Sequence, residues 1–286
     1  MPRTIASAFE VLRQDLEITD LQARTVSTRQ TTVREAVAAE LTVLDSFLAG
    51  SYNRDTLIAP LKSADVDIFV VLHHEYWTAN NYTEILDKIK TALKKRYNTP
   101  DISRNGQAVT IRFDDFTVDV VPCFNRNGGG YLIPDSILKR WISTDPKKHI
   151  DLWTAANQAH SGDLVPLLKM LKGWNTTHDV MRSFHLEVLA VHVLTGVTIS
   201  DFPSGVRYVF DKARAFIKVK LADPAGYSDD VASYVNTQAQ IDAITAGLNL
   251  AHDRAVAAEA LATAGRVSEA FDKWRLVFGD YFPAYG

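Results

Sequence analysis

The chain has 286 residues, of which 47% are hydrophobic and 23% are charged, the balance of an ordinary soluble globular protein. The formal net charge of −3 does not suit a protein whose whole surface binds DNA or an anionic membrane. The longest uninterrupted apolar run, residues 68–72, is far too short to cross a bilayer, and the charged N-terminal stretch holds no secretory signal. We therefore expect a cytoplasmic protein with no membrane partner and no obligatory nucleic-acid partner.

The first fifty residues have a helical pattern. Apolar residues recur at spacings of three and four, which predicts one face of a helix that ends at Gly50. These residues are Val33, Val37, Leu41, Leu44 and Leu48. Residues 65–72 are apolar and rich in β-branched side chains, which predicts a buried strand, and residues 83–97 return to a helical pattern.

Two further strands are predicted at residues 108–113 and 117–124, joined by a hairpin turn at Asp114 and Asp115. Cys123, the single cysteine, lies in the second of these strands, where we expect an inert buried thiol. The glycine-rich residues 125–130 predict a loop or hairpin tip. After about residue 140 the strand signals stop.

The second half of the chain is predicted to be helical. Asp163 is a candidate N-cap, Ser183 is a candidate N-cap for a helix that includes residues 186–194, and Pro203 marks the start of a third helix. The alanine-rich residues 239–264 predict a long helix. The resulting fold class is α+β, with N-terminal helices and a mixed α/β core in residues 1–140, an all-helical lobe in residues 141–286, and a cleft between the two.

Gly50-Ser51 is a first candidate functional feature. A glycine followed by a hydroxyl residue lets backbone N–H groups and an O–H group approach phosphate oxygens closely. The same dipeptide can also be an ordinary turn.

Three aspartates form the second candidate feature. Asp65 and Asp67 open the buried strand and project from the same face, because side chains alternate along a strand. Asp119 interrupts another β-branched strand. Each acid could instead lie at a solvated strand end or have a structural partner. Together, beside a Gly-Ser loop, they indicate a site for two Mg²⁺ ions that hold a triphosphate, with Mn²⁺ as a substitute.

This pattern resembles the polymerase-β-like nucleotidyltransferases, and segments of the second half narrow the resemblance to the bacterial cGAS/DncV-like nucleotidyltransferases (CD-NTases). These segments are GYLIPD at 130–135, WISTDP at 141–146 with His149 and Asn157 after it, LLKMLKGW at 167–174 and SFHLE at 183–187. The resemblance runs from about residue 33 to 195. It implies a nucleotidyltransferase core followed by a helical lobe, with the active site in the cleft between them.

The resemblance also implies an activity. Such enzymes join NTPs, ATP or GTP among them, into a cyclic di- or trinucleotide second messenger, release pyrophosphate, and act in anti-phage signalling through an effector that binds the soluble product. The alternative is a nucleotidyltransferase that acts on an RNA, protein or small-molecule acceptor. A nucleotide-binding module without catalysis is disfavoured because all three carboxylates are present.

Site roles carry over position by position. The resemblance implies that Asp65 and Asp67 hold both metals and that Asp119 holds the metal nearest the attacking hydroxyl. Gly50, Ser51, Lys169 and Ser183 would contact the triphosphate, and Phe184 would stack on a nucleobase. Without the resemblance, Ser183 would be an N-cap, Lys169 an exposed lysine and Phe184 a core residue. The basic run in residues 88–96 could be a solvated helix face or a nucleic-acid patch.

Overall fold

The computed structural model describes residues 2–98, 101–228 and 230–286. The chain forms two compact units, one of Ile18–Trp153 and one of Met1–Glu17 with Thr154–Gly286. This division differs from the predicted one at both ends of the sheet-containing unit. The first helix, α1 (Ile5–Asp15), packs with the C-terminal helices because its buried Phe9 meets Trp274 edge-to-face at 4.9 Å.

A seven-stranded mixed sheet forms the centre of the first unit. Its strands are β1 (Val43–Leu48), β2 (Asp65–Leu72), β3 (Asp101–Asn105), β4 (Ala108–Arg112), β5 (Thr117–Asn125), β6 (Tyr131–Asp135) and β7 (Arg140–Thr144). The order is β1-β2-β5-β4-β3, and β6 pairs with both β5 and β7. Among the strand pairs of the described residues, β2–β5 is the parallel one and the others are antiparallel. Because β7 pairs with β6, residues 140–144 stay with the sheet, although strand signals were expected to stop at about residue 140.

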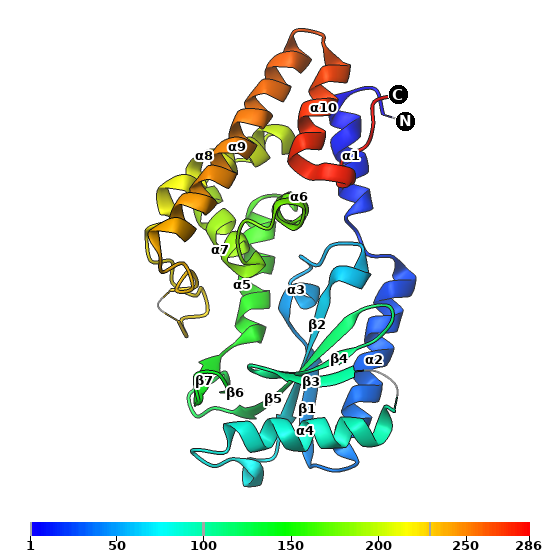
Figure 1. The fold of residues 1–286 in the computed structure, drawn as a ribbon, viewed down its shortest axis with the longest axis vertical. Helices are drawn as coiled ribbons and strands as arrows, with labels where there is room; N and C mark the ends of the chain where they lie inside the picture. Colours follow the sequence, from blue (N-terminus) through cyan, green and yellow to red (C-terminus); the bar gives the residue numbers. More distant parts are fainter. Residues whose placement is uncertain (1, 99–100, 229) are drawn as a thin grey trace. The chain divides into compact units, whose positions relative to one another are not determined.

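The two faces of this sheet have different surroundings. Helices α2 (Asp20–Ala38) and α4 (Tyr82–Arg96) pack against one face and form the main apolar core with residues such as Val66 and Ile68 (Figure 1). Side chains of the opposite face include Asp67 and then Phe69, because successive strand residues alternate. A smaller apolar cluster, which includes Phe69 and the fully buried Cys123, occupies the rest of that face.

The predicted helix that ends at Gly50 is wrong in its second half. The helix α2 ends at Ala38, and residues 43–48 form β1, which pairs antiparallel with β2. Leu44 is 49% exposed, so it belongs to no buried helical stripe. The spacing of Leu41, Leu44 and Leu48 fits a helix, but hydrogen bonding to the neighbouring strand decides the structure of this segment.

The other predicted elements of this unit are confirmed. The buried strand is β2, the predicted helix at 83–97 is α4, and the two strands joined at Asp114 and Asp115 are β4 and β5, which pair antiparallel. Residues 125–130 connect β5 to β6 as a hairpin tip. The sequence did not predict β3, β6 or β7.

The second unit consists of helices. They are α1, the end of α5 (Pro146–Ala159), α6 (Leu164–His178), α7 (Ser183–Leu194), α8 (Phe202–Ala213), α9 (Gln238–Thr263) and α10 (Val267–Phe278). Helices α9 and α10 lie side by side, and the two chain ends meet where the N–H of Gly286 lies 3.4 Å from the carbonyl of Pro2 (Figure 1). Within the described ranges no helix combines the length and the apolar character that a membrane crossing requires.

The starts of these helices agree only partly with the predicted caps. Asp163 occupies the N-cap of α6 without a side-chain cap bond; instead Asn157 Oδ1 accepts the N–H of Val165 at 3.0 Å. The predicted cap at Ser183 is wrong, because Ser183 is the first helical residue of α7 and Arg182 is the N-cap. The prediction for Pro203 is confirmed, since proline lies in the first turn of α8.

Candidate active site

Three carboxylates stand on one face of the sheet, on two adjacent parallel strands. Asp67 on β2 is paired with Asp119 on β5, and Asp65 precedes Asp67 by two residues on the same face. Neighbouring strands lie about 4.8 Å apart, and paired residues of parallel strands project to the same side. The structure therefore brings together the three acids that the sequence singled out.

The electrostatics of the cluster reflect this crowding. Burial raises the pKa of the Asp65 carboxyl, and the charge of Asp119 raises it further. Asp119 is itself held in place, because Oγ1 of Thr110 donates to its Oδ1 at 2.5 Å. Thr110 lies directly opposite Asp119 on β4 and is buried.

Thr110 is a residue that the sequence analysis missed. Its only sequence signal is a hydroxyl between the apolar Val109 and Ile111 in a predicted strand. A buried hydroxyl needs a hydrogen-bond partner, so the threonine indicates a polar group across the ladder. That group is the carboxylate of Asp119.

The Gly50-Ser51 segment touches the cluster. Gly50 has a φ of +60°, and a β-carbon at this position would lie 1.7 Å from Oδ2 of Asp67. The N–H of Ala49 donates to the carbonyl of Asp67 at 2.9 Å. A glycine is therefore required twice, once for the backbone conformation and once for the space that the carboxylate occupies.

The backbone around Ser51 is held on both sides. Asn53 Nδ2 donates to the carbonyl of Leu48 at 2.8 Å, and the N–H of the buried Thr56 donates to the carbonyl of Ser51 at 2.9 Å. Ser51 itself is partly buried in the short helix α3 (Gly50–Asn53). The loop thus keeps a hydroxyl residue next to the Gly50–Asp67 contact.

The donor set suits a hard divalent cation. Three carboxylates on one face repel one another, and Mg²⁺ or a similar ion both removes that repulsion and prefers oxygen ligands. Among the described residues, however, no group of three His, Cys, Asp or Glu side chains already stands as a complete ligand set around one point. The three aspartates fit such an ion by chemistry and by strand register.

Lys169 lies on α6 in the helical unit. It is not the exposed lysine that is expected without the family resemblance. Its side chain is 3% exposed, and its Nζ lies 2.6 Å from Oε2 of Glu17, at the end of the segment that contains α1. Glu17 is 152 residues away in the sequence, so no local signal could have predicted this partner.

Ser183 and Phe184 begin α7 in the same unit. Ser183 is exposed and Phe184 is partly buried, so neither the N-cap nor the core interpretation describes them. The expected meeting of Lys169, Ser183 and Phe184 with the carboxylates stays a prediction.

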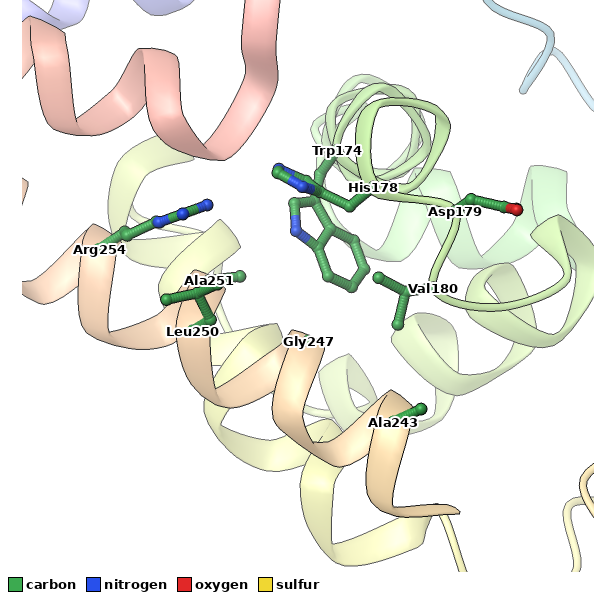
Figure 2. A pocket seen from close by; sticks show the side chains of 9 residues that line it. All are labelled: Trp174, His178, Asp179, Val180, Ala243, Gly247, Leu250, Ala251 and Arg254. Carbon is green, nitrogen blue, oxygen red and sulfur yellow. The ribbon is translucent and has the colours of Figure 1, made fainter. Parts of the chain in front are cut away.

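A cavity of about 310 Å³ lies between α6 and α9 of the helical unit, and none of the residues that line it is a predicted site residue (Figure 2). Arg254 points toward His178 and Trp174 across it. Both basic side chains are bound to the end of α10: Arg254 Nη1 donates to the carbonyl of Leu276 at 2.7 Å, and His178 Nε2 lies 2.8 Å from that of Val277. These groups therefore serve as a cap for α10.

A mixed sheet with paired carboxylates on adjacent strands, beside a Gly-Ser turn in contact with one of them, agrees with the nucleotidyltransferase core that the sequence resemblance implies. The family model described as "Second Messenger Oligonucleotide or Dinucleotide Synthetase domain" matches residues 3–157. The chain belongs to this family. The predicted resemblance to bacterial CD-NTases and, at the level of the family, the predicted enzyme class are thereby confirmed.

Individual relatives agree with this assignment. The cyclic AMP-AMP-AMP synthase of Acinetobacter sp. is 32% identical over 201 residues, which cover 65% of this chain and 57% of that protein. A probable cyclic nucleotide synthase of Bacillus cereus is 26% identical over 275 residues, or 82% of this chain and 81% of that one. These relatives do not favour the alternative of an RNA, protein or small-molecule acceptor.

The fold also matches a solved structure. The Escherichia coli MS115-1 CdnC in a structure with ATP superposes with a TM-score of 0.78 at 16% identity, covering 98% of this chain and 99% of that one. The predicted fold class, a mixed sheet followed by helices, is confirmed.

Proposed function

We propose that this chain joins NTPs into a cyclic oligonucleotide second messenger and releases pyrophosphate. The observation that carries the proposal is the register that places Asp67 beside Asp119, with Asp65 on the same face and Gly50 against Asp67. Membership in a family of second-messenger synthetases supports it.

In the proposed reaction a sugar hydroxyl of one nucleotide attacks the α-phosphorus of another, an O–P bond forms, and the bond to pyrophosphate breaks. Asp65, Asp67 and Asp119 would hold two Mg²⁺ ions, or Mn²⁺ as a substitute. When bound, these ions neutralise the triphosphate and the leaving pyrophosphate and make the hydroxyl a better nucleophile. Thr110 keeps Asp119 oriented for this task.

The remaining predicted residues would bind the nucleotide. Ser51 would donate its hydroxyl to a phosphate oxygen, because its loop is fixed against Asp67. Lys169 and Ser183 would donate to the triphosphate, and Phe184 would stack on a base. Lys169 can do so only in competition with Glu17, which already binds its ammonium group.

ATP is the first substrate to test, since the Acinetobacter relative is named for an AMP trimer and the E. coli structure holds ATP. GTP is the second. We further propose a cytoplasmic role in anti-phage signalling, in which the soluble product reaches a separate effector.

The test is incubation of the purified protein with all four NTPs and Mg²⁺, followed by mass spectrometry. A cyclase needs no other acceptor, so we expect a product whose mass equals two or three nucleoside monophosphates minus one water per linkage, resistant to phosphatase. Nucleotide transfer that is detected only when RNA, a protein or a small-molecule acceptor is added to the NTPs would contradict the proposal.

A further inference from the structure

The first turn of α7 carries Ser183 and Phe184, yet its N-cap contributes no side-chain hydrogen bond. The N-cap is Arg182, and Ser183 after it is exposed. The first N–H groups of a helix have no partner within it, and an unsupported first turn frays. Support for this turn comes from Tyr234, 52 residues further along the chain.

Tyr234 contacts α7 on both sides of Ser183 and Phe184. Its Oη accepts the backbone N–H of Arg182 at 2.9 Å and lies 3.0 Å from Nδ1 of His185. The guanidinium of Arg182 lies over the tyrosine ring, 4.3 Å from its centroid. The ring of His185 meets it edge-on at 5.7 Å. One tyrosine therefore fixes residues 182 and 185 with respect to each other.

The direction of one of these hydrogen bonds follows from its donor. A backbone N–H can only donate, so Oη accepts from Arg182, while the direction of the bond between Oη and Nδ1 of His185 is set by the tautomer of the imidazole. Burial lowers the pKa of His185, partly opposed by the charge of Asp230, and burial raises the pKa of Tyr234. Both directions favour a neutral imidazole and a neutral phenol at pH 7.

The segment that carries Tyr234 has no helix or strand in its described residues, and side-chain hydrogen bonds hold it in place. It connects the short helix η3 (Arg214–Phe216) to α9. The buried Asp223 accepts the N–H groups of Ala225 and Tyr227, and Oδ1 of Asp230 accepts that of Ala232 at 2.9 Å. Carboxylates that accept several backbone N–H groups hold a loop as a side-chain turn does. These hydrogen bonds fix the backbone that carries Tyr234.

We infer that Tyr234 is a positioning residue for the nucleotide site, acting through the first turn of α7. The inference rests on the proposed function, which assigns Ser183 and Phe184 to the nucleotide. The tyrosine hydroxyl orders this turn before the nucleotide binds. The binding free energy is therefore not reduced by the entropy lost when the turn becomes ordered. Tyr234 lies in the part of the chain for which the sequence predicted helices and no site residue.

The test is Tyr234→Phe, which keeps the ring and removes the hydroxyl. Both hydrogen bonds disappear, so the apparent KM for NTP should rise about three- to tenfold. The value of kcat should change little, because a contact that acts on the bound nucleotide in ground state and transition state alike affects KM. Tyr227→Phe is the matched control in the same segment, since the backbone N–H of Tyr227 keeps its bond to Asp223. Its KM should stay at the wild-type value.

A second pair of variants tests the same bond from α7. Arg182→Ala keeps the backbone N–H, whereas Arg182→Pro removes it, and the φ of −64° at this residue suits proline. The proline variant should show a KM several-fold above that of the alanine variant. In the Tyr234→Phe background this difference should vanish, because the acceptor is gone.

An unchanged KM in Tyr234→Phe overturns the inference. A lower kcat with unchanged KM also overturns it, since that is the result of a smaller folded fraction. If Tyr234→Phe does not fold, equal KM values for Arg182→Ala and Arg182→Pro overturn it instead. A wild-type protein that consumes no NTP contradicts the proposed function rather than the role of Tyr234 alone.

Discussion

The α-carbon of Gly50 lies so close to the carboxylate of Asp67 that no side chain fits between them. Gly50→Ala should therefore displace either the loop or Asp67, and its positive φ adds backbone strain. Misplacing a reacting group by about 1 Å costs about a hundredfold in rate, so we expect NTP turnover to fall by that order.

The matched control for this variant is Gly128→Ala. Gly128 also has a positive φ, +89°, but a β-carbon there would meet nothing within 4 Å. It therefore carries the backbone strain without the contact. Turnover measured at equal folded concentration should be near normal in Gly128→Ala; equal losses in the two variants would show that strain alone explains the effect.

Asp65→Asn tests the combined cost of burying the Asp65 carboxylate and of its repulsion by Asp119. A carboxyl whose pKa is raised by folding favours the protonated folded state, so the charged group costs stability once the pH exceeds its raised pKa. The asparagine variant lacks that cost. At pH 7 the variant should unfold at the wild-type temperature or above it. The difference between the two unfolding temperatures should disappear as the pH falls below the ordinary pKa of a carboxyl.

Thermal unfolding between pH 3 and pH 7 gives this comparison, with Asp114→Asn in the exposed β4–β5 turn as the control. A variant at Asp65 that is clearly less stable than wild type at pH 7 would mean that the carboxylate has a stabilising structural partner that outweighs burial and repulsion.

Lys169→Ala should weaken NTP binding. A charge-assisted hydrogen bond to phosphate contributes about 1.5–3 kcal/mol, which corresponds to roughly one to two decades in affinity. The partner that remains, Glu17, is 42% exposed and can be hydrated, so the fold should survive. Titration of NTP and Mg²⁺ by thermal shift measures the effect; an unchanged affinity would remove Lys169 from the site.

The exposed Lys218 of the same unit is the control for this change. Lys172 is unsuitable as a control, because its ammonium group is buried 3.3 Å from the carboxylate of Glu187, which is 1% exposed.

That buried pair gives a stability prediction of its own. Lys172→Met removes a charged partner of the buried Glu187 and should lower the free energy of unfolding by about 3–5 kcal/mol. Adding Glu187→Leu should restore most of this loss, because a well-packed apolar pair often replaces a buried ion pair without cost. Urea unfolding of the single and the double variant measures both free energies of unfolding and tests this prediction. A double variant as unstable as the single one would contradict this account.

The sequence predicted those parts of the fold whose pattern has one interpretation. The apolar run of β2 and the periodic stripe of α4 are examples, and both were confirmed. The strand β1 was missed because Leu44 and Leu48 match a helical spacing, and only pairing with β2 decides against it. A single sequence does not show which strands will pair.

The candidate site shows the same division. Asp65, Asp67 and Asp119 were found because acids are unusual in core strands. Thr110, Glu17 and Tyr234 were not found, since each acts through a partner distant in sequence or across a ladder. Contacts of this kind follow from the tertiary fold and leave no local pattern.

The most direct test of the central claim, that the three aspartates carry nucleotidyl transfer, is Asp119→Asn. This change keeps the shape of the side chain and removes one negative charge from the cluster. NTP with Mg²⁺ should still bind through Ser51, Lys169 and the other two aspartates, and so still raise the unfolding temperature.

Product formation by the same preparation should fall by several orders of magnitude, because the attacking hydroxyl would be a poor nucleophile at neutral pH. We would measure NTP-dependent thermal shift and labelled cyclic product side by side. A retained thermal shift with lost product is the predicted result. Product formation close to that of wild type would contradict the assignment of Asp119 to the reaction, and loss of both signals together would contradict its separation from nucleotide binding.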